Sequence, residues 1–323
     1  MKKIILTFII SLFILKNVDA SANWFKPVKS ESLKNEKLAR RNSLPSNAYF
    51  YQIDIQEFKN LLAHAPLRGT TSSSNVIIEF PNAYGKTERF KVFESPIMHR
   101  ALAAKFPMIK TYAAQGVDDP TATMRFSITQ FGLHTMCISG KHSSNYIDPY
   151  TADGSYIIVY DKASLPNSNQ NFECTTDNAV DLPSLRNGGS PKQFDTNDQI
   201  LRTYRLAQSC TAEYGNIFAL TPGQEVADIQ AQMTITMNRV NGVYERDLAV
   251  TMEFVPNNDT LIFYGSTTAD PWTNEWNTTT AQTIDARIGV NNYDIGHNFN
   301  TTGGGNAGCI ACVCLSTSQS GTH

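Results

Sequence analysis

Residues 221–254 read TPGQEVADIQAQMTITMNRVNGVYERDLAVTMEF, and the spacing of the apolar residues changes within this stretch. In its first part they recur every three or four residues, which is the spacing of one helix face: Val226, Ile229, Met233, Met237 and Val240. In its last part they alternate, as in a half-buried strand: Leu248, Val250, Met252 and Phe254. Thr221-Pro-Gly-Gln has the residues of a capped helix start, with Thr221 as N-cap. The stretch therefore predicts a helix that leads directly into a strand.

The sequence on either side of this stretch continues the same mixture of strands and helices. Residues 201–207 alternate as a strand, and residues 280–288 have the spacing of a second helix. Further extended segments are predicted at residues 261–264, 293–299 and 309–315. The resulting order, β-α-β-β-α-β-β, predicts an α/β domain over residues 199–323.

The first half of the chain has a different pattern. Residues 49–163 contain several alternating, β-rich runs and one helical segment at residues 98–106, which predicts a mostly antiparallel β domain. Residues 164–198 are rich in Asn, Ser, Pro and Asp, as linkers are, and residues 21–48 form a polar leader that we expect to be flexible or partly helical. The fold class predicted for the whole chain is α+β, with two domains.

The first twenty residues have the three parts of a signal peptide. Lys2 and Lys3 precede a mostly apolar run from Ile4 to Leu15, and Val18-Asp19-Ala20 suits a cleavage site after Ala20. The alternative, a membrane anchor, is disfavoured because the run is too short for a hydrocarbon core of about 30 Å. We therefore expect a secreted or periplasmic protein with no membrane segment after cleavage.

Charge and cysteine content narrow the classes of function. The formal net charge is -2, which provides no basic patch for nucleic acid or anionic lipid. An exported protein with an even number of cysteines usually forms disulfides, and we expect this of all six, whose pairing stays open: Cys137, Cys174, Cys210, Cys309, Cys312 and Cys314. The crowded group at residues 309–314 could instead suggest a zinc knuckle, but it lacks nearby ligands for a tetrahedral site.

Most catalytic motifs are absent from the sequence. No two histidines stand one helical turn apart, as a helical zinc site requires, and no Gly-x-Ser-x-Gly elbow occurs. Cys210 is the best candidate for a reactive thiol, although we favour a disulfide there. His297, in Asp294-Ile-Gly-His-Asn-Phe, looks like half of a metalloprotease helix, but Tyr293 stands where the first histidine would be. We interpret His297 as a buried structural imidazole.

Several longer segments carry a family resemblance. They are Leu201-Arg-Thr-Tyr-Arg-Leu-Ala, Met237-Asn-Arg-Val-Asn-Gly-Val-Tyr-Glu-Arg-Asp-Leu, Asn292-Tyr-Asp-Ile-Gly-His-Asn-Phe with the Gly-rich loop after it, and, upstream, Phe90-Lys-Val-Phe-Glu-Ser-Pro-Ile-Met, Ala103-Ala-Lys-Phe-Pro and Gly116-Val-Asp-Asp-Pro-Thr-Ala-Thr. Over residues 49–163 and 200–314 the chain resembles secreted reprolysin-like zinc metallopeptidases of the metzincin clan. The resemblance implies an N-terminal pro-region, a zinc cofactor, and protein or peptide substrates hydrolysed by a zinc-bound water.

The zinc-binding pattern of that clan, His-Glu-x-x-His-x-x-Gly-x-x-His, does not occur in this sequence. We therefore assign no catalytic residue and no metal ligand, and we expect a fragment or an early-terminated gene product that does not hydrolyse peptides. One functional element is predicted to remain, the edge strand that pairs with substrate in the family: Gly308, Ile310, Ala311 and Val313. The alternative function is a secreted, non-catalytic β-rich binding or inhibitory module.

Overall fold

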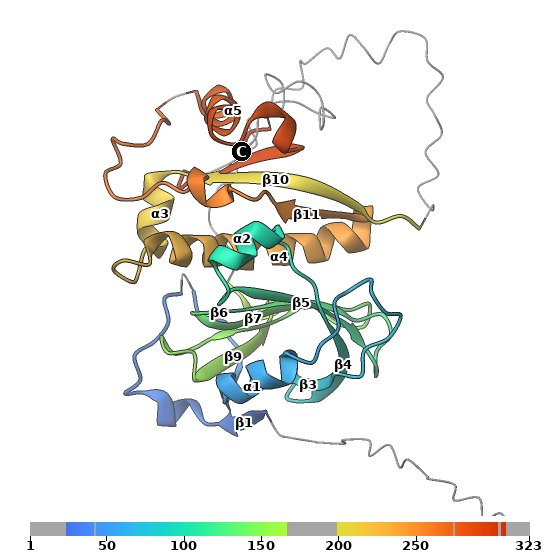
Figure 1. The fold of residues 1–323 in the computed structure, drawn as a ribbon. Coiled ribbons are helices and arrows are strands. Elements are labelled where there is room, and N and C mark those ends of the chain that lie inside the picture. Colours follow the sequence, from blue (N-terminus) through green and yellow to red (C-terminus); the bar gives the residue numbers. More distant parts are fainter. Residues whose placement is uncertain (1–23, 42, 167–198, 274, 303–304, 308–323) are drawn as a thin grey trace, which may run out of the picture.

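The computed structural model describes residues 24–41, 43–166, 199–273, 275–302 and 305–307. Two sheets lie one above the other in this part of the chain, with the helix α4 (Glu225–Leu248) between them (Figure 1). The lower sheet is antiparallel and is built from the first half of the chain. The upper sheet is parallel and belongs to the second half, so the α+β fold class is confirmed.

The antiparallel sheet has nine strands in the order β1-β2-β9-β8-β7-β6-β5-β4-β3. The strands are β1 (Phe25–Val28), β2 (Tyr49–Ile53), β3 (Ile77–Pro81), β4 (Thr87–Glu94), β5 (Lys110–Gly116), β6 (Thr123–Thr129), β7 (Gly132–Ile138), β8 (Asn145–Pro149) and β9 (Tyr156–Asp161). The predicted pair of strands within residues 123–139 is β6 and β7, which turn directly from Thr129 to Gly132. The helix predicted at residues 98–106 is α2 (Arg100–Lys105).

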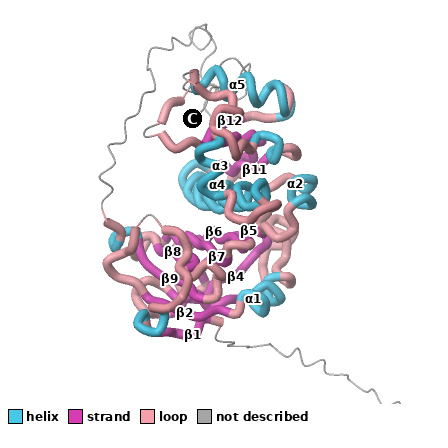
Figure 2. The backbone as a smooth tube through the Cα atoms, turned by 90° about the vertical axis from the view of Figure 1, so that its left-hand side faces the viewer, coloured by secondary structure: helices cyan, strands magenta, loops and turns pink. Residues whose placement is uncertain are grey.

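The antiparallel sheet curls into a near-barrel around an aromatic core. Phe25 of β1 and Phe80 of β3 stand at opposite edges of the sheet order, yet their ring centroids are only 5.7 Å apart. Phe58, on the helix α1 (Ile55–Leu62), packs against both rings at 5.7 and 6.0 Å. The helix therefore packs against both edge strands (Figure 1), and Figure 2 shows it at the same end of the sheet as β1 and β2.

Two features of this domain differ from the predictions. The leader is partly helical as predicted, with the 3-10 helix η1 at Ser30–Leu33. It also contains the unpredicted strand β1, which pairs with β2 because Phe25 is buried in the core of the near-barrel. The helix α1 was not predicted; Asp54 caps it by accepting hydrogen bonds from the backbone N–H groups of Gln56 and Glu57.

Among the described residues the parallel sheet has three strands, with β10 (Arg202–Cys210) between β11 (Val250–Phe254) and β12 (Ile295–Phe299). Besides α4, this half contains α3 (Ala212–Phe218), α5 (Trp276–Arg287) and the short 3-10 helix η3 (Asn258–Leu261). The strand predicted at residues 261–264 is not formed; η3 occupies its start, and only an isolated bridge joins Ile262 to Cys210.

The helix α4 begins later than predicted. It starts at Glu225, with Gln224 as an N-cap that makes no side-chain capping bond, so the predicted cap at Thr221 is wrong. The preceding turn is held instead by Asp228, whose carboxylate accepts the N–H groups of Leu220 and Thr221 at 3.1 and 2.7 Å. The predicted apolar face is confirmed, because Ile229, Met233 and Met237 are all buried.

Both sheets pack on α4 (Figure 1). One of the hydrophobic clusters also contains residues from both halves of the chain. That core joins Ile97 and Leu102 of the first half to Ile229 and Phe254 of the second. The backbone continues the connection: the N–H of Phe254 donates to the carbonyl of Ile97 at 2.7 Å, and the N–H of His99 donates to the carbonyl of Phe254 at 3.0 Å. The segment around Met98 thus extends the parallel sheet beyond β11.

Within the described ranges, no helix has both the length and the hydropathy needed to cross a bilayer. The predicted signal peptide (residues 1–20) and nearly all of the predicted linker (residues 164–198) lie outside the described residues. The proposed domain boundaries therefore stay predictions.

Candidate functional site

A row of buried polar side chains lies between the parallel sheet and the helices that pack on it. The backbone N–H of Gln208, on β10, donates to the side-chain oxygen of Asn258 at 2.7 Å. Asn258 in turn donates to the side-chain oxygen of Gln230, on α4, at 3.3 Å. All three residues are fully buried, so these bonds fix η3 and α4 against the central strand.

His297 lies in this row, on β12 rather than on a helix. It is half-buried, its Nδ1 is 3.1 Å from Nε2 of Gln208, and its ring meets Phe299 edge to face at 5.3 Å. The hydroxyl of Ser209 donates to the His297 carbonyl, and Asn298 donates to that hydroxyl. These contacts join β10 and β12, so His297 has a structural position, although its ring is half-buried rather than buried as predicted.

Cys210, at the carboxyl end of β10, has the chemistry of an inert thiol. It is buried and free, and its Sγ is 3.7 Å from the carbonyl of Phe263. Burial raises the pKa of Cys210 to about 12, so the thiol stays protonated at neutral pH and is a poor nucleophile.

Two of the six cysteines that were predicted to form disulfides have no disulfide partner among the described residues. Cys137 and Cys210 are free thiols, and both are buried among core residues. The remaining four lie outside the described residues: Cys174, Cys309, Cys312 and Cys314. The predicted substrate edge strand lies outside them as well, at Gly308, Ile310, Ala311 and Val313.

The described residues do not fit a zinc ion. No three side chains of His, Cys, Asp and Glu gather at a possible metal position anywhere in the described part of the chain. Near His297 the buried polar atoms that lack a partner among the described residues are the side-chain oxygens of Gln208 and Asn298. Neutral amides are unlike the thiolate, imidazole and carboxylate ligands that zinc takes in proteins.

A second polar cluster, which the sequence did not reveal, lies where α4 meets the near-barrel. Arg125, on β6, forms an ion pair with Glu245 of α4, and Arg68 reaches the other oxygen of the same carboxylate at 2.8 Å. Arg125 is 4% exposed, although it belongs to an alternating run from Thr123 to Thr129 that otherwise carries no charge. In the sequence, this cluster is indicated only by the charged residue Arg125 within a strand that is otherwise uncharged.

The parallel sheet has the order β11-β10-β12, and α3 and α4 connect β10 to β11 in the chain, which defines an α/β arrangement. Residues 230–323 of this domain match the model of the metallo-peptidase family M12B, described as reprolysin-like. Over these residues the chain is similar to a reprolysin-like metallopeptidase domain, in agreement with the resemblance seen in the sequence. The family consists of zinc metallopeptidases, whose substrates are proteins. A comparison with curated proteins finds no match.

Proposed function

We propose that the protein is a secreted zinc-dependent metalloendopeptidase precursor of reprolysin type, in which the near-barrel serves as the pro-region. The observation that carries the proposal is the family match over residues 230–323, which falls on the α/β domain. The near-barrel precedes that domain in the chain and packs on its first long helix, as expected of a region that assists folding.

The contacts of α4 support this role for the near-barrel. Asn238 donates to the carbonyl of Phe126 at 2.9 Å and to the hydroxyl of Ser127 at 3.0 Å. Without the near-barrel, the buried side of α4 that carries Asn238 and Glu245 would face water. The near-barrel thus supplies the surface that covers this side of α4, as proposed for a pro-region that assists folding.

We further propose that residues 1–323 do not themselves bind zinc tightly or hydrolyse peptide bonds, since the sequence contains no His-Glu-x-x-His. Titration of the purified chain with zinc in a calorimeter tests the first part, and cleavage of casein with and without a chelator tests the second. We expect neither stoichiometric binding nor chelator-sensitive cleavage. Either result would overturn this part of the proposal.

The alternative function, a non-catalytic binding or inhibitory module, has one observation in its favour: the near-barrel has a hydrophobic core of its own. Against it, Ile97, Met98 and Leu102 belong to the core shared with the metallopeptidase domain. Unfolding of an isolated segment 21–163 separates the two. A cooperative transition together with binding to a metallopeptidase would favour the module, whereas an aggregated or non-cooperative segment would favour the pro-region.

Export is also a proposal, supported by the charged and apolar pattern of residues 1–20. N-terminal sequencing of protein recovered from the medium or periplasm should begin at Ser21. Recovery of the chain only in the cytoplasm, with Met1 or Lys2 at its start, would contradict it.

A further inference from the structure

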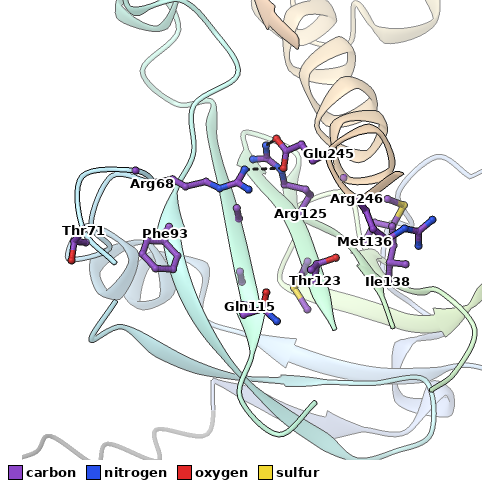
Figure 3. Close-up of a pocket in the computed structure, with 15 residues that line it drawn as sticks. Arg68, Thr71, Phe93, Gln115, Thr123, Arg125, Met136, Ile138, Glu245 and Arg246 are labelled. Atoms are coloured by element: carbon purple, nitrogen blue, oxygen red, sulfur yellow. Dashed lines mark hydrogen bonds and ion pairs between the residues drawn. The ribbon is translucent and has the colours of Figure 1, made fainter. Parts of the chain in front are cut away.

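A cavity of about 360 Å³ lies between the near-barrel and the C-terminal half of α4 (Figure 3). Its floor is one row of the antiparallel sheet, in which Phe93, Ala113, Arg125 and Met136 stand side by side on four neighbouring strands. Small-molecule sites in proteins usually measure about 300–1,000 Å³. The cavity is thus large enough for a small organic molecule.

Two residues shape the cavity, Ala113 by its small side chain and Gly242 by having none. Ala113 stands between the large side chains of Phe93 and Arg125 in the floor. Gly242 forms the roof; a Cβ atom there would lie 3.1 Å from Cγ of Arg125 and 3.3 Å from Cε of Met136. Glycine therefore lets the helix approach the sheet closely at one end of the cavity, while Ala113 leaves the other end open.

Two arginines share one carboxylate at the wall of this cavity (Figure 3). Glu245 pairs with Arg125 through one oxygen and with Arg68 through the other. Arg125 also donates from Nη1 to the hydroxyl of Ser95 at 2.7 Å, but its buried Nε has no partner among the described residues. The three charges leave an excess of one positive charge, and one buried N–H group is unsatisfied.

The pKa shifts of Glu245 and Arg125 agree with an excess of one positive charge. Burial alone would raise the pKa of Glu245, but the guanidinium groups of Arg125 and Arg68 outweigh it and hold that pKa below its usual value. Glu245 is therefore ionised at neutral pH. Burial and the nearby Arg68 charge both disfavour the charged form of Arg125, so a second anion beside the two arginines would stabilise them.

We propose that this cavity is a binding site for a small monocarboxylate with an apolar body, whose carboxylate contacts Arg125 and Arg68. The apolar body would lie against Phe93, Met136 and Ile138, which line the cavity around Ala113. Guanidinium groups suit carboxylates because their N–H donors match the spacing of the two oxygens. The proposal does not depend on the proposed peptidase activity, since none of these residues is assigned a role in zinc binding or hydrolysis.

Two kinds of ligand carry one carboxylate on an apolar body: the carboxyl end of a peptide whose last residue is apolar, and a free aliphatic acid. Titration of the full chain with N-acetyl-leucine represents the first and hexanoate the second, with N-acetyl-leucinamide as the uncharged control. We expect at least one of the acids to bind at one site with a Kd below about 1 mM, and the amide to bind at least about tenfold more weakly. The acid that binds identifies the source.

Three variants locate the binding. Arg68→Met should weaken it at least about tenfold, because one of the two cations is lost. Ala113→Leu should abolish it by filling the hollow. The matched control is Arg89→Met, which removes an arginine of similar exposure that is paired with Asp118 away from the cavity; it should leave binding unchanged.

Each result of these binding experiments either supports the proposal or overturns it. Selective binding of either acid that is lost in Ala113→Leu, with the thermal unfolding of that variant preserved, supports the proposal. Binding of neither acid, equal binding of acid and amide, or unchanged binding in Ala113→Leu overturns it.

Discussion

The two sides of α4 meet their neighbours by different physical means. Toward the parallel sheet the helix presents Ile229, Met233 and Met237, which share a core with β10 and β11. Toward the near-barrel it presents Asn238, Arg239 and Glu245, which bind backbone carbonyls and buried charges. One helix thus joins a mainly apolar interface to a mainly polar one.

This difference bears on how each interface tolerates change. Apolar contacts are non-directional, so a side chain of similar volume can replace another at modest cost. A buried ion pair adds little stability over a well-packed apolar pair, but the loss of one partner leaves an uncompensated charge in the interior. We therefore expect the polar interface to be the less tolerant of single substitutions.

The largest effect is expected at the pair formed by Asp148 of β8 and Arg239 of α4. Nη2 of Arg239 lies 2.5 Å from the Asp148 carboxylate, which also accepts the hydroxyl of Tyr160 at 2.6 Å. Asp148→Ala should lower the free energy of unfolding by about 4 kcal/mol, because the Arg239 charge is left without a counter-ion. Urea denaturation of the variant and the parent measures the change.

Replacing both residues of the pair tests whether the lost stability comes from the unpaired charge. In the double variant Asp148→Leu with Arg239→Met no charge is left uncompensated, so it should be markedly more stable than Asp148→Ala. If the two variants are equally destabilised, packing rather than charge holds this part of the interface.

On the apolar side, Met233 is fully buried in the shared core. Met233→Ala removes several buried groups and leaves a cavity, and it should cost about 3 kcal/mol in the free energy of unfolding. Met233→Leu conserves the volume and should cost less than about 1.5 kcal/mol. Similar losses in the two variants would show that this face does not tolerate conservative replacement, contrary to the distinction drawn above.

Lowering the pH should reduce the free energy of unfolding, and we expect His134 of β7 to be the first group responsible. Burial lowers the pKa of His134 to about 4, from 6.5, and the nearby Asp148 only partly offsets this. Between these two pH values the unfolded chain binds a proton that the folded protein does not, so stability falls as the pH falls. We expect a loss of about 2 kcal/mol between pH 7 and pH 4.5, measured by urea denaturation at each pH.

The control for this prediction is His134→Gln, which has no proton to bind in this window. Carboxylates with lowered pKa values, such as Asp148 and Glu245, lose their stabilising charge only at lower pH. The variant should therefore show a much flatter dependence above pH 4.5. An unchanged slope in the variant would assign the acid sensitivity to another group.

The same contrast explains what could be predicted from the sequence. The apolar face of α4 repeats at helical spacing, so it was predicted correctly from residues 226–240 alone, as was the strand that follows it. The polar face could not be predicted, because the partner of Arg239 lies 91 residues away in the sequence and that of Arg125 lies 120 away. Spacing along the chain carries no information about such pairs.

Errors in the fold prediction also arose where local signals competed with contacts distant in the sequence. Thr221 has the sequence of a helix cap, but Asp228 binds the turn before α4 and delays its start. Phe25 lies in a polar leader, yet it completes an aromatic cluster with Phe58 and Phe80. For the candidate site, the family was predicted from ordered motifs, whereas the cavity beside Arg125 depends on the packing of α4 against the sheet.

The smallest effect is expected at the rim of the contact between the two halves of the chain. Lys105 of α2 pairs with Asp259 of η3 at 2.8 Å, and its side chain is 42% exposed. Exposed pairs are worth about 0.2–1 kcal/mol, because water and salt screen the attraction and two flexible side chains must be ordered. Lys105→Met should therefore change the free energy of unfolding by less than about 1 kcal/mol, and raising the salt concentration should reduce even that difference. A loss comparable to that of Asp148→Ala would mean that exposure does not separate weak from strong pairs across this contact, and the contrast between its buried and exposed charges would have to be abandoned.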